Sequence, residues 1–278
     1  MAAVKVGHAS IFRKLRANII GMIHLPASPG TPGFSGSVND ILLKAAREAA
    51  IYKHAGVDSV LIENMHDIPY LHSSAVGPEV VSVMTAAASV VRSVFSHAPV
   101  GVQILAGANQ QALAVALAAG LDFIRAEGFV YSHVADEGIM DACAGPLLRY
   151  RRHIGAQNIA VFTDIKKKHS AHSITSDVSI AETARAAEFF RSDGVIVTGS
   201  STGQPVDVAE LTDVLNAVKI PVFVGSGVTL ENFRQYSHVT GLIIGSYFKT
   251  DHHWTRDIDE SVLADFMDKV KNHQERDS

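Results

Sequence analysis

Residues 194–246 read GVIVTGSSTGQPVDVAELTDVLNAVKIPVFVGSGVTLENFRQYSHVTGLIIGS. This stretch contains three short apolar runs, each ending in glycine and small polar residues, at 194–199, 221–225 and 241–246. Continuous apolar runs are typical of strands buried on both faces, as in a parallel sheet. Residues 207–218, between the first two runs, have the composition of a helix. The stretch therefore predicts parallel strands that are joined by helices.

The same alternation runs along the whole chain. The predicted strands are residues 19–25, 59–64, 100–105, 123–127, 159–166, 194–199, 221–225 and 241–246. The predicted helices are residues 40–55, 79–97, 108–119, 138–154, 179–191, 207–218, 230–236 and 258–273. Eight such units predict a closed (β/α)8 TIM barrel, whose usual size is about 250 residues. An open doubly wound sheet is the alternative, but it normally carries a glycine-rich dinucleotide fingerprint after an early strand.

The composition is that of a globular chain with a large core. The chain has 278 residues, of which 47% are apolar and 19% charged, and its mean hydropathy is +0.16. These values exclude an intrinsically disordered protein. Because no shift in composition marks a linker, we expect one TIM-barrel domain over residues 1–278. Residues 1–18 would form an N-terminal cap, and residues 250–278 a C-terminal loop and helix.

The net charge and the cysteine content limit which partners and which cellular compartment are expected. The 24 basic and 28 acidic residues give a net charge of −4, which argues against a nucleic-acid-binding surface. No apolar run reaches the roughly 18 residues of a membrane span. One cysteine, Cys143, cannot form an internal disulfide, which favours a reducing compartment. We therefore expect a soluble, intracellular, cytoplasmic protein. The basic start, with no acidic residue before Asp40, leaves a mitochondrial location open.

Charged or polar side chains lie near the ends of several predicted strands. They are His24, Glu63, Arg125, Glu127, Asp164 and Lys166. Arg125 and Glu127 are two residues apart, as are Asp164 and Lys166, so each pair lies on one face of its strand. In a TIM barrel these strand ends converge on the mouth that holds the active site. We therefore predict a catalytic site there, with a buried ion network of no catalytic role as the alternative.

Roles are expected for Glu63, Arg125, Asp164 and Lys166. Asp164 or Glu63 would be the general base, because a partly dry mouth raises the pKa of a carboxyl group. Arg125 would orient an anionic or carbonyl group and hold Glu127 charged. Lys166 would be an electrostatic clamp, because Asp164 on the same face favours the ammonium form. A Schiff-base lysine is the alternative role for Lys166.

Glycine, serine and threonine follow the last three predicted strands. Loops after the seventh and eighth strands of TIM barrels often hold a phosphate through backbone N–H groups and a helix N-terminus. The expected phosphate-binding residues are Gly225, Ser226, Gly227, Gly245 and Ser246, joined by Gly199 and Thr202. The alternative is that these glycines only make tight turns.

The sequence shows no spacing typical of a metal site, and we predict neither a metal nor a cofactor. A divalent cation held by the carboxylates of Glu63 and Asp67 remains an alternative. Cys143 lies in the predicted helix 138–154 and is interpreted as a small buried hydrophobic side chain.

Several longer motifs, in order along the chain, resemble one known family. They are GMIHLP (21–26), ENMHDIPY (63–70), DFIRAE (122–127), DEG (136–138), LLRYR (147–151), DIKKKH (164–169) and the TG pairs at 198–199 and 202–203. The chain is similar to the BtpA/SgcQ family over about residues 12–249. The resemblance implies a phosphate-binding-like TIM barrel. It links the cyanobacterial members to photosystem I accumulation and the bacterial ones to sugar metabolism, and it supplies no agreed catalytic residues.

Two functions of different classes are compatible with these patterns. The first is an enzyme that acts on a phosphorylated sugar or nucleoside-like metabolite by acid–base chemistry. The second is a non-enzymatic stabilisation or assembly factor that uses the barrel as a scaffold. The converging charges favour the enzyme. The expected partners are a small phosphorylated ligand and other copies of the chain in a homo-oligomer.

Overall fold

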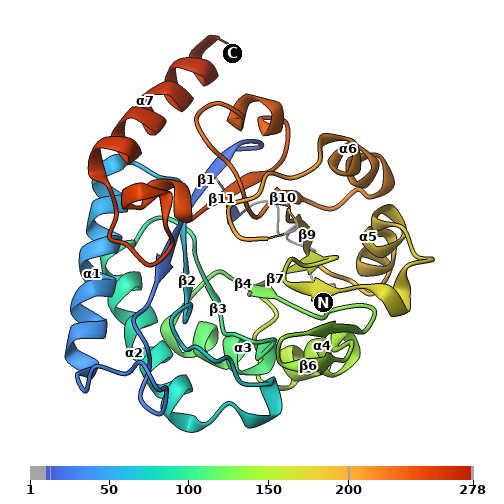
Figure 1. Ribbon diagram of the computed structural model, residues 1–278, viewed down its shortest axis with the longest axis horizontal. Helices are drawn as coiled ribbons and strands as arrows, with labels where there is room; N and C mark the ends of the chain where they lie inside the picture. Colours follow the sequence, from blue (N-terminus) through green and yellow to red (C-terminus); the bar gives the residue numbers. More distant parts are fainter. Residues whose placement is uncertain (1–10, 13, 200, 277–278) are drawn as a thin grey trace, which may run out of the picture.

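Eight parallel strands close into a ring at the centre of the protein (Figure 1). The computed structural model describes residues 11, 12, 14–199 and 201–276. Around the ring the strands are β1 (Asn18–His24), β11 (Gly241–Ile244), β10 (Val222–Val224), β9 (Gly194–Val197), β7 (Ala160–Ile165), β4 (Phe123–Ala126), β3 (Val100–Gln103) and β2 (Ser59–Glu63). The TIM barrel predicted from the sequence is confirmed, and each predicted strand overlaps one of these eight.

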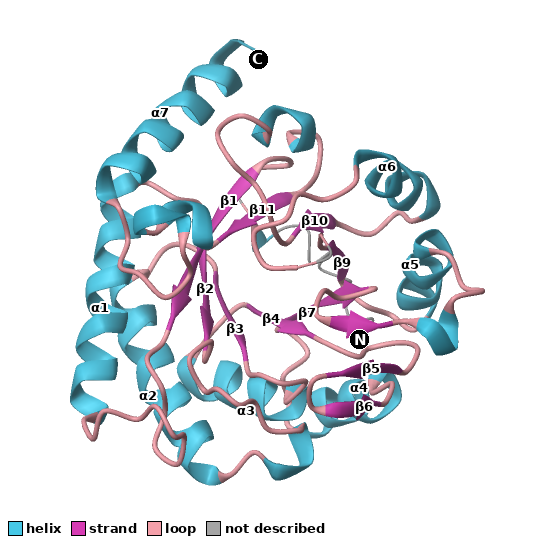
Figure 2. Ribbon diagram, in the orientation of Figure 1, coloured by secondary structure: helices cyan, strands magenta, loops and turns pink. Residues whose placement is uncertain are grey.

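Helices surround the ring, as the secondary-structure colouring shows (Figure 2). They are α1 (Val38–Ala55), α2 (Pro78–Val94), α3 (Asn109–Ala119), α4 (Ala144–His153), α5 (Ile180–Phe189), α6 (Val208–Ala217) and α7 (Glu260–Arg276). Local chemistry fixes the bounds of α1. The Ser37 side chain accepts a hydrogen bond from Asp40 N–H at its start, and Gly56 adopts φ 76° at its end.

Two predicted helices are wrong in part. Residues 138–154 do not form one helix, because Gly138–Met140 is a strand, β6, that pairs antiparallel with β5 (His133–Ala135). Gly138 has φ 105°, a conformation that suits a turn and that side chains rarely adopt. The second error concerns residues 230–236, where only the short 3-10 helix η4 (Phe233–Tyr236) forms. The strands β5 and β6, with β8 (Ser170–Ala171), make a small separate sheet.

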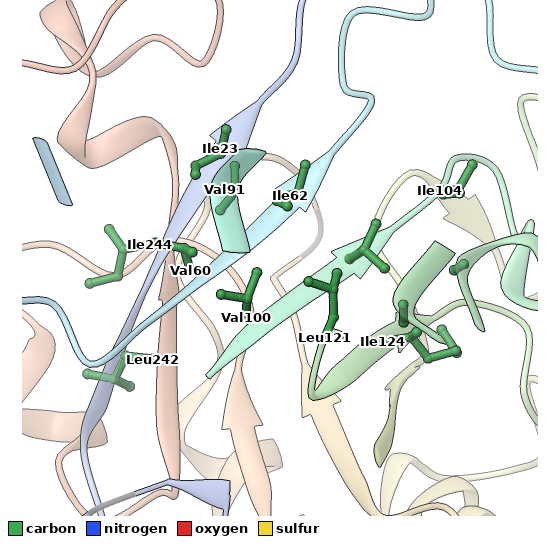
Figure 3. Packing of buried hydrophobic residues seen from close by; sticks show 14 of the residues in the cluster. Ile23, Val60, Ile62, Val91, Val100, Ile104, Leu121, Ile124, Leu242 and Ile244 are labelled. Atoms are coloured by element: carbon green, nitrogen blue, oxygen red, sulfur yellow. The ribbon is translucent and has the colours of Figure 1, made fainter. Parts of the chain in front are cut away.

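The side chains along each strand alternate between two apolar layers, one outside the ring and one inside it. Outward side chains such as Val60, Ile62 and Val100 pack with the surrounding helices, and Val91 of α2 is among their neighbours (Figure 3). The intervening residues face the interior of the barrel. Below the mouth this inner layer consists of Ile20, Met22, Leu61, Phe123, Ala160, Phe162, Ile196, Phe223 and Ile243. The period of two places every second residue of each strand inside the ring.

Phe12 closes the interior at the end where the strands begin. Its ring centroid lies 6.0 Å from that of Phe123, 6.2 Å from that of Phe162 and 5.7 Å from that of Phe223. Phe12 belongs to the predicted N-terminal cap, residues 1–18, of which residues 1–10 and 13 lie outside the described part and Asn18 is already the first residue of β1. Aromatic groups of this kind contribute both buried area and edge contacts to a core.

No helix in the described part of the chain is both long and apolar enough to span a bilayer.

Replacing Phe12 by alanine should lower the free energy of unfolding by about 3 kcal/mol, because the change empties space between three aromatic rings. Urea unfolding measures the loss. Phe189→Ala is the matched control, since Phe189 is 81% exposed, and its effect should stay within about 0.5 kcal/mol. Equal losses in the two variants would contradict a core role for Phe12.

Candidate functional site

A cavity of about 820 Å³ opens where the carboxyl ends of the strands meet. Its volume is in the range of ligand-binding pockets, about 300–1,000 Å³. Of the residues predicted for the site, those that line it are His24, Glu63, Arg125, Glu127, Asp164, Thr202, Gly225, Ser226, Gly227, Gly245 and Ser246. Lys166 and Gly199 are not among its lining residues.

The base of the cavity continues the inner faces of five neighbouring strands. His24, Glu63, Arg125 and Asp164 each follow an inward apolar residue by two positions, so the interior changes from apolar to polar at this level. Gln103 stands beside Glu63 in the register of β2 and β3. All five are buried. We call these five residues the polar floor.

Arg125 and Asp164 form a bidentate ion pair in the polar floor. Arg125 Nε donates to Asp164 Oδ2 at 3.0 Å, and Arg125 Nη2 donates to Oδ1 at 3.0 Å. Burial raises the pKa of Asp164, and the guanidinium acts against that shift. Of the nitrogens of Arg125, Nη1 has no hydrogen-bond partner among the residues that the structure describes. The pair therefore presents a fixed positive group to the cavity.

Glu63 is the carboxylate of the floor that has no close cationic partner. Within ion-pair distance the described residues give it only His24, with 3.6 Å between Glu63 Oε2 and His24 Nε2, while the charges of Arg125 and Lys168 act on it from further away. Burial raises the pKa of Glu63. Burial and Lys249 lower the pKa of His24 well below its usual value, so the imidazole is neutral. Its Nδ1 lies 3.2 Å from the carbonyl oxygen of Trp254. Glu63 is thus free to exchange a proton with a ligand.

Glu127 is held by groups other than the predicted one. Its Oε1 accepts a hydrogen bond from Lys167 Nζ at 3.2 Å, and its Oε2 accepts one from Gly107 N–H at 3.1 Å. The hydrogen bonds of Arg125 go to Asp164 instead. The direct ion-pair partner of Glu127 is therefore Lys167, and Arg125 interacts with Glu127 only by charge at longer range. The contact that matters comes from a lysine three residues beyond Asp164.

The predicted position of Lys166 is also wrong. Strand β7 ends at Ile165, and Lys166 has φ 47°, which breaks the alternation that would have placed it on the face of Asp164. Its Nζ donates to the carbonyl oxygen of Thr175 at 2.8 Å, away from the cavity. Lys168 reaches the cavity instead. Burial and the neighbouring Arg125 lower the pKa of Lys168. In the sequence Lys168 is one of three consecutive lysines, and nothing there distinguishes it from the other two.

The loops after β10 and β11 form one wall of the cavity, which we call the glycine wall (residues 225–228 and 245–246). Among the described residues, the backbone N–H groups of Gly227 and Val228 have no hydrogen-bond partner. The helix N-terminus expected here is not formed, since Thr229 N–H donates to Asn232 Oδ1 and only the four-residue η4 follows. An anion at this wall would therefore meet loop amides rather than a helix dipole.

At two glycines of the predicted site, packing leaves no room for a larger residue. A Cβ on Gly227, which has φ 66°, would overlap the carbonyl group of Gln204, and so would a Cβ on Gly199. Ser226 Oγ ties the same loops together, because it accepts from Gly199 N–H at 2.8 Å and donates to Gln204 O at 3.2 Å. Thr202 lies at the rim with its Oγ1 2.8 Å from His169 Nε2. Gly199 thus supports the glycine wall from behind.

The wall that follows β2 and β3 is apolar and was missed in the sequence. We call it the apolar wall, and it consists of Met65, Ile68, Pro69, Tyr70, Leu105 and Ala106. Asn64 fixes it, because its Oδ1 accepts from Leu105 N–H at 2.8 Å and its Nδ2 donates to Asp67 Oδ2 at 2.8 Å. The sequence signal for this wall is the motif at residues 63–70. Its carboxylates are predicted above as possible cation ligands, whereas in the structure Asn64 and Asp67 hold the loops of the wall in place.

The structure does not bring Glu63 and Asp67 together as cation ligands. Asp67 Oδ1 accepts a hydrogen bond from Ser28 N–H at 2.7 Å, and Asp67 does not line the cavity. Within the described ranges, no three His, Cys, Asp or Glu side chains are grouped as a metal site would need. Cys143 is the N-cap residue of α4 rather than an interior helix residue, and it is half-buried.

Comparison with known proteins shows to which family the chain belongs. The family model described as the BtpA family matches residues 15–272. This chain belongs to the BtpA family. An uncharacterised protein of Caenorhabditis elegans whose name includes "mitochondrial" is 51% identical, covering 94% of this chain and 96% of that protein. The photosystem I biogenesis protein BtpA of Synechocystis is 31% identical, with 91% and 87% covered. The family resemblance predicted from the motifs is confirmed.

Solved structures with the same fold are more distant in sequence. The phosphoribosyl anthranilate isomerase of Thermus thermophilus has a TM-score of 0.56 at 11% identity, covering 92% of this chain and 98% of that one. The N-acetylmannosamine-6-phosphate 2-epimerase of Clostridium perfringens has a TM-score of 0.54 at 15% identity, with 88% and 92% covered. These likenesses support the TIM barrel of this BtpA-family chain and say nothing about its reaction.

Glu63→Gln should change how stability depends on pH. The folded pKa of Glu63 is raised by burial above the unfolded value of about 4.3. The stabilisation from this group is therefore complete below the unfolded pKa and is lost as the pH rises through the folded pKa. The variant lacks that loss, so its free energy of unfolding relative to wild type should increase with pH. Urea unfolding at several pH values measures this, with the exposed Glu79→Gln as control. A difference that stays flat with pH would contradict the assignment.

Proposed function

We propose that this chain is an enzyme that acts on a phosphorylated sugar or nucleoside-like metabolite by acid–base chemistry at the mouth of its barrel. The position of Glu63 carries the proposal. It is a buried carboxyl group with a raised pKa, it lies on the floor of an open cavity, and of the described residues only a neutral histidine is within ion-pair distance of it. A group in this state is suited to take and return a proton near neutral pH.

Arg125 supplies the electrostatic part of this chemistry. Asp164 binds two of its nitrogens and fixes the plane of the guanidinium. The remaining Nη1 is available to an oxygen of the ligand that gains negative charge as Glu63 removes a proton. Donors fixed in advance stabilise such charge without reorganising during the reaction. Because both oxygens of Asp164 accept hydrogen bonds from Arg125, Glu63 is the better candidate for the base.

The phosphate end of the ligand would lie at the glycine wall. Within the described part of the chain no acceptor takes the N–H groups of Gly227 and Val228, and backbone amides in loops of this kind are suited to anions. Lys168 lines the same cavity, and no carboxylate of the described residues lies within ion-pair distance of its Nζ. It therefore takes the electrostatic role that the sequence had assigned to Lys166.

A non-enzymatic assembly factor is the second candidate, because one relative is named a photosystem I biogenesis protein. A scaffold of that kind has no use for an unpaired carboxyl group at the base of a cavity, where burial without compensation is unfavourable. The two candidates differ in what they require. The enzyme depends on the polar floor, whereas the scaffold tolerates its neutralisation.

A thermal-shift screen of phosphorylated sugars and nucleotides should find a ligand, since a ligand at 100 times its Kd stabilises the folded state by about 2.7 kcal/mol. Lys168→Met should abolish most of that shift, because it removes the ammonium group from the cavity. Lys166→Met is the matched control and should keep the shift, because its Nζ binds Thr175 outside the cavity. Loss of the shift in both variants, or in neither, would contradict the assignment of Lys168.

Glu63→Gln should lower kcat for that ligand about 10²–10⁴-fold while leaving its Kd within about threefold, because the amide keeps the shape and loses the proton-accepting function. Steady-state kinetics and calorimetry separate the two effects. Glu231→Gln, at the exposed rim of the same cavity, should leave kcat unchanged. A Glu63→Gln variant with full turnover would favour the scaffold.

A further inference from the structure

The two walls of the cavity lie on different sides of the barrel mouth. In the closed strand order, β3 is four strands away from β10 in either direction around the ring. The loop after β3 carries Leu105 and Ala106, and the loop after β10 carries Gly227 and Val228. The rest of the apolar wall follows β2, which is three strands from β10 and two from β11 by the shorter way. A ligand that used both walls would therefore reach across the mouth, over the polar floor.

The apolar wall is a built surface. Asn64 joins the loops after β2 and β3 through its bonds to Leu105 N–H and Asp67. Tyr70 Oη donates to the carbonyl oxygen of Met65 at 2.8 Å, which holds the aromatic ring in place over the same loop. A second backbone bond, from Ala106 N–H to Leu71 O at 3.1 Å, joins the two loops again. The wall is therefore fixed before any ligand arrives.

This fixed wall leaves apolar surface uncovered. Ile68 is 49% exposed although it lines the cavity. Uncovered apolar surface inside a pocket indicates an apolar or flat part of the ligand, because its burial is favourable. A phosphate or a polyhydroxylated sugar would leave the apolar wall exposed to water. A planar heterocycle has the faces to cover it.

The middle of the cavity offers a different kind of contact. Gln103 is 2% exposed, it lines the cavity, and its Oε1 has no hydrogen-bond partner among the described residues. Buried polar atoms are nearly always paired, and this one would gain a donor if a bound ligand turned the amide toward the cavity. A sugar hydroxyl supplies such a donor. Glu63 stands beside Gln103 in the register, so the sugar would lie over the proposed base.

We infer that the ligand carries a planar base on a sugar phosphate, so that it is a nucleoside monophosphate or a close analogue rather than a plain sugar phosphate. This inference rests on the proposed function and narrows its substrate class. The phosphate lies at the glycine wall, the sugar over Gln103 and Glu63, and the base against the apolar wall. The order of the three groups follows from the order of the three surfaces.

Calorimetric titration tests this with ribose 5-phosphate and with AMP, GMP, CMP and UMP. At least one nucleotide should bind about tenfold tighter than ribose 5-phosphate, which is in the range that one base packed on such a surface contributes. Ile68→Ser should weaken that nucleotide at least threefold, by removing apolar wall surface, and leave ribose 5-phosphate unchanged. Ile174→Ser is the matched control, since Ile174 is 62% exposed and does not line the cavity, and it should change neither affinity.

The outcomes separate the two proposals. If ribose 5-phosphate binds as tightly as every nucleotide, the inference is overturned while the proposed function stands. If a nucleotide binds tighter but Ile68→Ser leaves its affinity intact, the base does not use the apolar wall and the inference is again overturned. If neither ribose 5-phosphate nor any nucleotide binds, the inference is overturned, and the proposed function fails with it only when the wider screen of phosphorylated sugars also finds no ligand.

Discussion

The mouth of the barrel depends on the ion pair between Arg125 and Asp164. Both groups are buried, and on their strands each follows a phenylalanine that packs inside the barrel. A charge at that depth is tolerated only when it is paired and hydrogen-bonded. The pairing satisfies Asp164 and thereby distinguishes it from Glu63, whose carboxyl group is left for the contents of the cavity. One bidentate contact thus gives two carboxylates on the same floor different environments.

The barrel itself could be predicted because its signal is repeated. Each strand is a short apolar run, each run is followed by a small residue or a helix, and the alternation fixes which side chains face inward. The same period of two located His24, Glu63, Arg125 and Asp164 correctly at the mouth, since these residues remain within or directly beside regular strands.

Prediction failed where the backbone leaves the strand. The rule of two holds only for extended conformation, and Lys166 adopts φ 47° one residue after β7 ends. That single turn moves Lys168 into the cavity. Asp67 shows a second kind of failure. Its carboxylate had the chemistry of a cation ligand, but its partners, Ser28 and Asn64, are set by loops that the sequence pattern does not fold. For the same reason, strand periodicity cannot predict the side-chain partners of Glu127 or the apolar wall.

Phe12 completes an interior that the inner apolar layer already fills, so the barrel has one open end. Its ring sits among three phenylalanines at the end opposite the mouth, so the interior is blind on that side. A ligand of the proposed kind would therefore enter and leave through the open end of the cavity. The segment with Trp254 lies at that end and contacts the polar floor through His24. A molecule bound over this face would close the cavity to such a ligand.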